Sequence, residues 1–252
     1  MTTENLMRAM ALYDWIEDFD LPSHPEFVVE LIQNSGIKPT KAEFHTHGKR
    51  NRRTIHKNSR LIDIIAQFKS YSDFEFCRPI GGNYLNLEFD IQYTAQSDEK
   101  LYIFSLPPRQ LPLIKLLDHV RLFCRHMTPR YGFSHVMDGP AATFFFSGIA
   151  ALSLSYDNQT RADDLGQTIR SDGAREHLSG KLHDVYELNV LSPAHLQRST
   201  FGQTLASWIA GGKKRGQLVE INGAVSVWLV PDDVRPGIRS KFFKEGLLIA
   251  TV

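Results

Sequence analysis

Cysteine is scarce in this chain of 252 residues, and its two cysteines, Cys77 and Cys124, match no zinc-binding or redox spacing. A reduced cytosolic setting is therefore predicted. No apolar run approaches the roughly 18 residues that a membrane-spanning helix needs, and the start Met-Thr-Thr-Glu lacks the basic stretch of a signal peptide. These scarcities predict a cytoplasmic protein without membrane segments.

An excess of charge of either sign is also missing. The chain has 29 Lys and Arg residues against 28 Asp and Glu residues, which gives a formal net charge of +1. For the chain as a whole, this balance argues against a dedicated nucleic-acid binder or a membrane-surface protein. A hydrophobic content of 42% and a charged content of 23% are those of an ordinary globular protein.

The first 36 residues predict two helices. Apolar residues recur at helical spacing in the first, at Leu6, Ala9, Met10, Tyr13 and Ile16. Pro25 begins the second helix and Gly36 ends it. Acidic residues crowd the end of the first helix, which is unfavourable for the helix dipole, so we expect a basic group or a partner nearby. A helical N-terminal segment with a basic loop is predicted for residues 1–75, either as a subdomain or continuous with residues 76–252.

The basic loop extends from Lys38 to Arg60 and contains eight Lys or Arg residues and one acidic residue, Glu43. It is either an arm that contacts phosphates or a solvated loop that pairs with the acidic helix end. Aromatic residues, on which nucleic-acid bases stack, are nearly absent here, which favours the solvated loop.

Strand patterns follow in adjacent pairs. Tyr84–Tyr93 alternates apolar and polar residues, and Lys100–Leu106 follows it after a polar hairpin loop. A long amphipathic helix is predicted over residues 113–127, and extended segments over Tyr131–Val136 and Thr143–Ile149. Because strands come in pairs rather than alternating with helices, the predicted fold class is α+β, with an antiparallel sheet and packed helices.

Residues 184–252 carry the clearest local signals, in the order strand, helix, helix, hairpin, helix, strand. Ser192-Pro193 opens the first of these helices. Gly211-Gly212 is expected to end the second with a left-handed residue. Asn222-Gly223 predicts a hairpin turn, and Pro231 begins the last helix.

Histidine is the most plausible metal ligand in the chain. His45-x-His47 on a strand would place both rings on one face, but a third ligand is missing and the following Lys and Arg residues disfavour a divalent cation. His119 and His126 lie on one predicted helix, about 10 Å apart, which is too far to share an ion. Both are expected to be surface or half-buried residues. No metal or cofactor is expected.

Catalytic patterns are weak as well. Asp90 with Asp98-x-Lys100 has the residue types of a metal-dependent nuclease, but the second pair falls in a polar turn without rigid support. Ser153 and Ser155 lack the Gly-x-Ser-x-Gly elbow of hydrolases. A binding protein is therefore favoured over an enzyme.

Short motifs follow one another from Tyr131 to the end of the chain. They are Tyr131-Gly132-Phe133, Ser147-Gly148-Ile149, Asp184-Val185-Tyr186 with Asn189, Leu191-Ser192-x-x-His195-Leu196, Thr204-Leu205-x-x-Trp208-Ile209, Arg215-Gly216-x-Leu218, Trp228-x-Val230-Pro231 and Ile238-Arg239. In this order they resemble the bacterial immunity proteins of polymorphic toxin systems, of the immunity-protein family fifty-two type. The resemblance covers roughly residues 84 to 252.

This resemblance implies an α+β cytosolic protein that binds and neutralises a cognate toxin, for example a nuclease delivered by contact-dependent or type VI secretion. Inhibition would occur by occlusion of the toxin's active site, without enzymatic activity of the chain itself. Asn189, His195 and Trp208 are expected to serve the fold, by capping the backbone and filling the core. The alternatives are a nucleic-acid-binding protein or metal-dependent nuclease that uses residues 38–60, and an adaptor that delivers an effector.

Acidic residues are the candidates for toxin binding. They lie in residues 157–175, a polar stretch that predicts a loop or a short helix. The candidates are Asp157, Asp163, Asp164 and Asp172. They form either an ordinary solvated surface or an acidic patch that meets a basic partner, such as the DNA groove of a nuclease.

Overall fold

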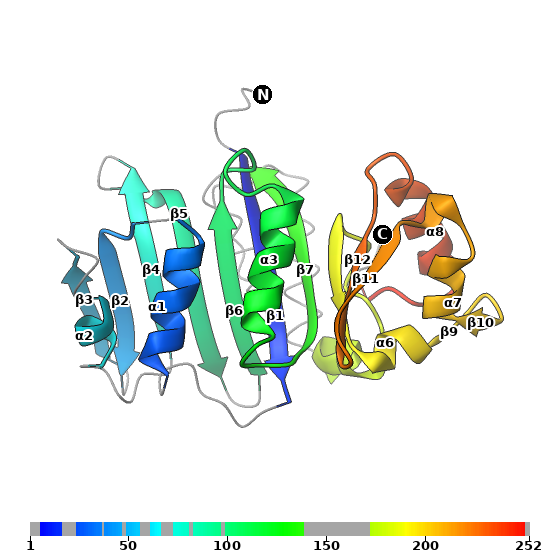
Figure 1. Ribbon diagram of the computed structural model, residues 1–252, viewed down its shortest axis with the longest axis horizontal. Coiled ribbons are helices and arrows are strands. Elements are labelled where there is room, and N and C mark those ends of the chain that lie inside the picture. Colours follow the sequence, from blue (N-terminus) through cyan, green and yellow to red (C-terminus); the bar gives the residue numbers. More distant parts are fainter. Residues whose placement is uncertain are drawn as a thin grey trace.

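A ten-stranded antiparallel sheet forms the framework of the protein (Figure 1). The computed structural model describes residues 6–16, 24–36, 38–46, 49–55, 61–66, 73–80, 83–96, 99–138 and 172–249. The strand order is β11-β12-β8-β7-β1-β6-β5-β4-β2-β3. Helices pack on the sheet, so the predicted α+β class is confirmed.

The strands of the large sheet are β1 (Leu6–Trp15), β2 (Lys41–Thr46), β3 (Lys49–Thr54), β4 (Asp73–Ile80), β5 (Asn83–Gln96), β6 (Glu99–Leu106), β7 (Pro129–Asp138), β8 (Leu188–Leu191), β11 (Gln217–Asn222) and β12 (Val225–Leu229). A small hairpin consists of β9 (Ser199–Thr200) and β10 (Gln203–Thr204). The helices are α1 (Pro25–Asn34), α2 (Leu61–Ala66), α3 (Leu113–Phe123), η4 (Asp172–Ser179), α6 (Pro193–Gln197), α7 (Leu205–Ala210), η5 (Lys213–Arg215) and α8 (Arg235–Lys244). None of these helices is long and apolar enough to cross a membrane.

The first element is a strand, so the helix predicted over residues 6–16 is wrong. β1 pairs with β6 on one side and with β7 on the other. Its residues are buried on both faces, with Met10 and Leu12 in one core and Ala11 and Tyr13 in the other. A strand buried on both faces has no polar alternation, and its apolar positions can therefore imitate helical spacing.

In the rest of the N-terminal segment, one prediction is confirmed and another is not. The helix predicted from Pro25 is confirmed as α1, and Gly36 follows it with a φ of 73°. The basic stretch predicted as an arm or a loop instead forms the hairpin β2–β3, with β3 at the edge of the sheet. The large sheet draws strands from both sides of residue 75, and the division of the chain at that residue stays a prediction.

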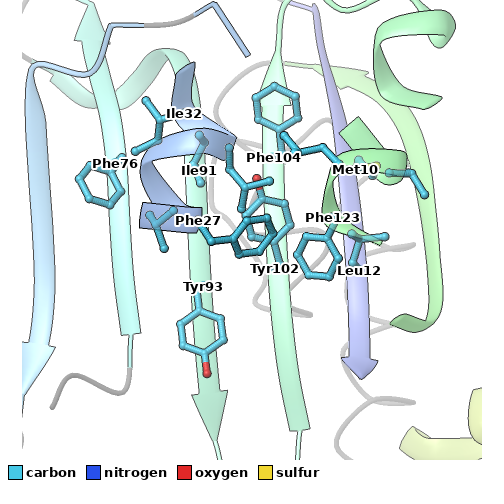
Figure 2. Packing of buried hydrophobic residues seen from close by; sticks show 14 of the residues in the cluster. Met10, Leu12, Phe27, Ile32, Phe76, Ile91, Tyr93, Tyr102, Phe104 and Phe123 are labelled. Carbon is cyan, nitrogen blue, oxygen red and sulfur yellow. The ribbon is translucent and has the colours of Figure 1, made fainter. Parts of the chain in front are cut away.

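Each face of the sheet carries its own core. Figure 2 shows the first, in which Phe27 and Ile32 of α1 and Phe123 of α3 pack on strand residues that include Ile91 and Tyr102. The second lies on the opposite face and joins alternate residues of β1 and β7 to α7 and α8. Trp208 and Trp228, predicted as core residues, are buried in it.

The predicted order of elements over residues 184–249 is largely confirmed. Of the predicted final strand, the residues that the structure describes form a parallel bridge between Leu182 and Leu248. The hairpin β11–β12 forms, but its two loop residues are Gly223 and Ala224, because Asn222 pairs with Val225. The side chain of Asn222 accepts the backbone N–H groups of Ala224 and Val225, as Asn does at the first position of a turn.

Gly211 and Gly212 end α7 for a different reason from the predicted one. Their φ angles of −74° and −165° are not left-handed. A Cβ at Gly212 would lie 2.9 Å from Nε of Arg215, so the missing side chain makes room for the Arg215 stem. Gly246, with a φ of 67°, follows α8 as a left-handed residue.

A buried ion pair links β1 to the C-terminal half of the chain. Nε of Arg8 lies 2.8 Å from Oε1 of Glu187, and Nη1 of Arg8 donates to the carbonyl of Leu111. The two charged side chains are 14% and 8% exposed. Both side chains are largely removed from water, so the attraction between them is needed to offset the cost of burying each charge.

We predict that Arg8→Met lowers the free energy of unfolding by about 3–5 kcal/mol, since it leaves the Glu187 carboxylate buried without a cation. Adding Glu187→Gln should recover part of the loss. The matched control is Arg121→Met, which breaks an exposed pair with Asp118 and should cost less than about 1 kcal/mol. Urea denaturation measures all three, and equal losses for the two single variants would contradict the prediction.

Candidate functional site

The acidic candidates for toxin binding fall almost entirely outside the described residues. Asp157, Asp163 and Asp164 are not among them. Asp172 is the first residue of η4, and only its backbone is described. The acidic patch therefore stays a prediction.

The basic segment supplies an edge strand rather than an arm. β3 has the sequence Lys-Arg-Asn-Arg-Arg-Thr, and among the described strands its partner is β2. His45 lies on β2 opposite Arg50, while His47 lies outside the described residues. Within the described ranges, no group of three or more His, Cys, Asp and Glu side chains is arranged to hold a metal ion.

The weak nuclease pattern is split between two strands. Asp90 lies on β5 opposite Ser105 of β6, and Lys100 lies on β6. The ammonium of Lys100 lies 5.5 Å from the ring centre of Trp15. The backbone N–H of Lys100 donates to the Asp14 carboxylate. Asp98 lies outside the described residues, so the pattern itself stays untested.

The two helical histidines differ in burial. His119, predicted as a surface or half-buried residue, is buried, and its Nε2 lies 2.8 Å from the hydroxyl of Tyr102. Its ring also stacks on Phe104 at 4.3 Å. His126 is exposed, and its ring lies 4.3 Å from that of Phe27. The prediction for His119 is thus wrong, because Tyr102 and Phe104 of β6 cover this side of α3.

A buried cluster of histidines and tyrosines lies in the second core, between the sheet and η4 and α6. His177 of η4 places Nε2 3.2 Å from Oδ2 of Asp14, at the end of β1. His183 donates its backbone N–H to the hydroxyl of Tyr131 of β7, at 2.9 Å. The ring of His195 of α6 stacks on Tyr131 at 5.1 Å. Three histidines from one stretch of the chain thus contact the ring of Tyr131, which lies on the distant strand β7.

Burial keeps three members of this cluster, His183, His195 and Tyr131, neutral. It lowers the pKa of His195 to about 3, and nearby His177 adds to this shift. The pKa of His183 is likewise well below its usual range because of burial and the charges of His177 and His195. Burial also raises the pKa of Tyr131 well above 10. These three rings are therefore neutral and serve packing and hydrogen bonding, and the burial of the cluster separates it from any substrate in solution.

Residues that were expected to serve the fold do so. The side-chain amide of Asn189 accepts the N–H of Tyr186 and donates to its carbonyl. Nδ1 of His195 accepts the backbone N–H of Ser192, which closes the first turn of α6. A neutral His195 therefore carries its proton on Nε2.

A further buried contact fixes α8. Nε of Arg239 lies 2.8 and 2.9 Å from the two carboxylate oxygens of Asp184. The N–H of Val185 donates to the same carboxylate. The sequence alone does not predict this ion pair, because Asp184 and Arg239 are 55 positions apart.

Comparison with solved structures shows a likeness in fold. No family model and no curated protein matches the sequence. The fold is similar to that of the Pseudomonas aeruginosa T6SS protein PA0821, with a TM-score of 0.62 and 14% sequence identity. The similarity covers 97% of this chain and 77% of that chain. At this identity, what is shared is the fold.

We predict that stability falls as the pH decreases below 6.5. The folded protein keeps His119 and His195 neutral down to about pH 3, whereas the unfolded chain binds their protons near pH 6.5. Protons are therefore taken up on unfolding, and each histidine should lower the free energy of unfolding by about 2–3 kcal/mol between pH 6.5 and 4.5. Denaturation at a series of pH values measures this slope.

The contribution of His119 can be separated with two variants. His119→Gln should reduce the proton uptake on unfolding near pH 5 by close to one, since Gln does not titrate. Tyr102→Phe removes the hydrogen-bond partner but keeps the buried ring, so it should preserve the slope while lowering stability. The same slope in wild type and His119→Gln would contradict the prediction.

Proposed function

We propose that this chain is an immunity protein that binds a cognate bacterial toxin and neutralises it by occluding the toxin's active site. The observation that carries the proposal is the similarity in fold to a T6SS protein over 97% of the chain. The ordered motifs from Tyr131 to Arg239, which resemble those of toxin-immunity proteins, support it independently.

The architecture suits inhibition by binding. A ten-stranded sheet with a core on each face is a rigid support, and its loops and edges remain for a partner. An inhibitor of this kind needs an interface of roughly 1,600 Å² or more, and nanomolar or tighter affinity follows when that interface is well packed. The titratable residues of the buried histidine cluster stabilise the fold in this proposal and do not catalyse.

The finer features of the proposal rest on the resemblance. The toxin would be a nuclease effector delivered by a type VI secretion system, and the chain would act in the cytoplasm without metal or cofactor. The acidic residues at positions 157–172 would then face a basic DNA-binding groove of the toxin.

We predict that the chain forms a stable 1:1 complex with the protein encoded by the gene immediately upstream and abolishes its toxicity. Size-exclusion chromatography and calorimetry measure the complex, and a plasmid-cleavage assay measures residual nuclease activity. EDTA added to the binding reaction should leave the affinity unchanged, because no metal takes part in occlusion. An unrelated toxin of the same class is the control. Separate elution together with normal killing of cells that express both proteins would contradict the proposal.

A second candidate function follows from the basic edge strand. Four of the six residues of β3 are Lys or Arg, and the strand lies at an edge of the sheet. Basic residues on such an edge strand can contact the phosphates of a nucleic acid. Charged residues there also discourage edge-to-edge pairing with another chain, which is a structural reason for their presence.

A gel shift with duplex and single-stranded DNA tests the second candidate. Nucleic-acid binding would appear at low salt, weaken steeply as salt increases, and disappear when Arg50, Arg52 and Arg53 are replaced by Gln. On the immunity proposal, we predict no shift at 50 mM salt for wild type. A salt-dependent shift that the triple variant loses would favour the nucleic-acid function instead.

A further inference from the structure

The hairpin β9–β10 has an unusual residue at its turn. Its two central residues, Phe201 and Gly202, have φ angles of 51° and 77°, as in a type I′ turn. Asn-Gly is the preferred pair for this turn, because a bulky side chain is strained at positive φ. Phe201 therefore occupies a position where the backbone disfavours it.

The side chain of Phe201 is also incompletely buried. The residue is 37% exposed, and residues 201–204 are all exposed. The space where Gly202 would carry a Cβ contains no atom within 4 Å, so the hairpin projects from the surface. Figure 1 shows it at the end of the molecule, beyond α7.

A rigid platform supports the exposed ring from beneath. The centre of the Phe201 ring lies 5.6 Å from that of Trp208 and 6.0 Å from that of Phe242. Phe242 in turn stacks on Trp228 at 5.6 Å. All three supporting rings are buried, so Phe201 is the outermost member of an aromatic stack whose other members are fixed.

Two helices that contact this aromatic stack, η5 and α8, are rich in basic residues, and Asp232, Asp233 and Glu245 flank α8. The guanidinium of Arg215 lies 4.8 Å from the ring centre of Trp208 and donates to the Trp208 carbonyl at 2.7 Å. η5 and α8 together contain seven basic residues and no acidic residue. Four exposed lysines of these two helices, which we call the basic patch, have no acidic partner among the described residues: Lys213, Lys214, Lys241 and Lys244.

We propose that Phe201 and the basic patch form the surface that docks the toxin, with Phe201 inserted into an apolar pocket whose rim is acidic. This inference rests on the proposed function and adds a second part to its binding face: the basic patch would meet an acidic surface of the toxin, and the acidic residues predicted at positions 157–172 would meet a basic one. Strain is retained at functional positions, and an aromatic side chain on a rigid support with a polar rim is the usual composition of a binding hot spot. The four lysines supply the charge complementarity that selects an acidic partner surface.

A structural role for Phe201, as a cover for Trp208, makes the opposite prediction for one substitution. Asn is favoured at the first central position of a type I′ turn, so Phe201→Asn relieves the backbone strain while it removes the ring. If Phe201 serves binding, this variant keeps or raises the melting temperature and loses affinity. If Phe201 serves the core, the melting temperature falls and affinity is retained by the folded fraction.

The test measures melting temperature by circular dichroism and affinity by calorimetry, with the protein encoded by the upstream gene as the probe. We expect Phe201→Asn to weaken binding by about 30-fold or more at unchanged or higher melting temperature. Lys213→Glu with Lys214→Glu should slow association, and the difference from wild type should shrink as salt increases. Matched controls on α3, which packs on the opposite face of the sheet, are Ile114→Asn and Lys115→Glu, and both should bind like wild type.

The outcomes separate the two proposals. Wild-type affinity in Phe201→Asn and in the double lysine variant would overturn the docking surface while the immunity function stands. A large fall in the melting temperature of Phe201→Asn would assign the ring to the core and likewise overturn it. Failure of the wild-type chain to bind would remove the immunity function and the surface together. A gel shift with DNA that the double lysine variant loses, without toxin binding, would assign the basic patch to nucleic acid.

Discussion

The pairing of β1 with both β6 and β7 is the constraint on which the rest of the structure depends. On one side of β1 the sheet continues through β6, β5, β4, β2 and β3, and on the other through β7, β8, β12 and β11. Without β1, these two halves have no strand between them. The two cores also meet at this strand, since its alternate residues belong to opposite faces. Folding of the chain therefore requires its first element to pair with strands about 90 and 120 residues further along.

Two polar contacts between distant parts of the chain also involve β1. Arg8 at its start reaches Glu187, and Asp14 at its end reaches His177, 163 residues away in sequence. The positive φ of Asp14, 40°, lies where the strand ends and its carboxylate turns toward Lys100 and η4. These polar contacts fix both ends of a strand whose middle is held by apolar packing.

Local signals were sufficient to predict much of the fold. Pro25, Gly36 and Ser192 marked helix ends because caps depend on neighbouring residues. β1 could not be predicted in this way, since burial on both faces removes the alternation that marks a strand. The basic hairpin was missed for a related reason, because β2 is defined by its pairing with β4 and not by its composition.

The candidate sites likewise depend on contacts between distant parts of the chain, which local sequence signals do not reveal. The cluster around Tyr131 draws its histidines from η4, the segment after it and α6, so only the tertiary fold brings them together. The expectation of a basic group near the acidic end of the first element rested on a helix dipole, and that element is a strand; at its end Asp14 contacts His177. Phe201 carries no sequence pattern that distinguishes it from a core aromatic residue. Its significance comes from a backbone angle and an exposed fraction, which are properties of the folded chain.

Hydrogen–deuterium exchange of the chain alone, and of the chain saturated with the protein encoded by the upstream gene, tests toxin binding most directly. The measurement reports both whether a complex forms and which amides it protects. We predict slower exchange on binding in residues 199–215 and 235–244, where the hairpin and the basic patch lie, and unchanged exchange in α3. Exchange rates that are the same with and without the partner over the whole chain would contradict the proposal that this protein is an immunity protein.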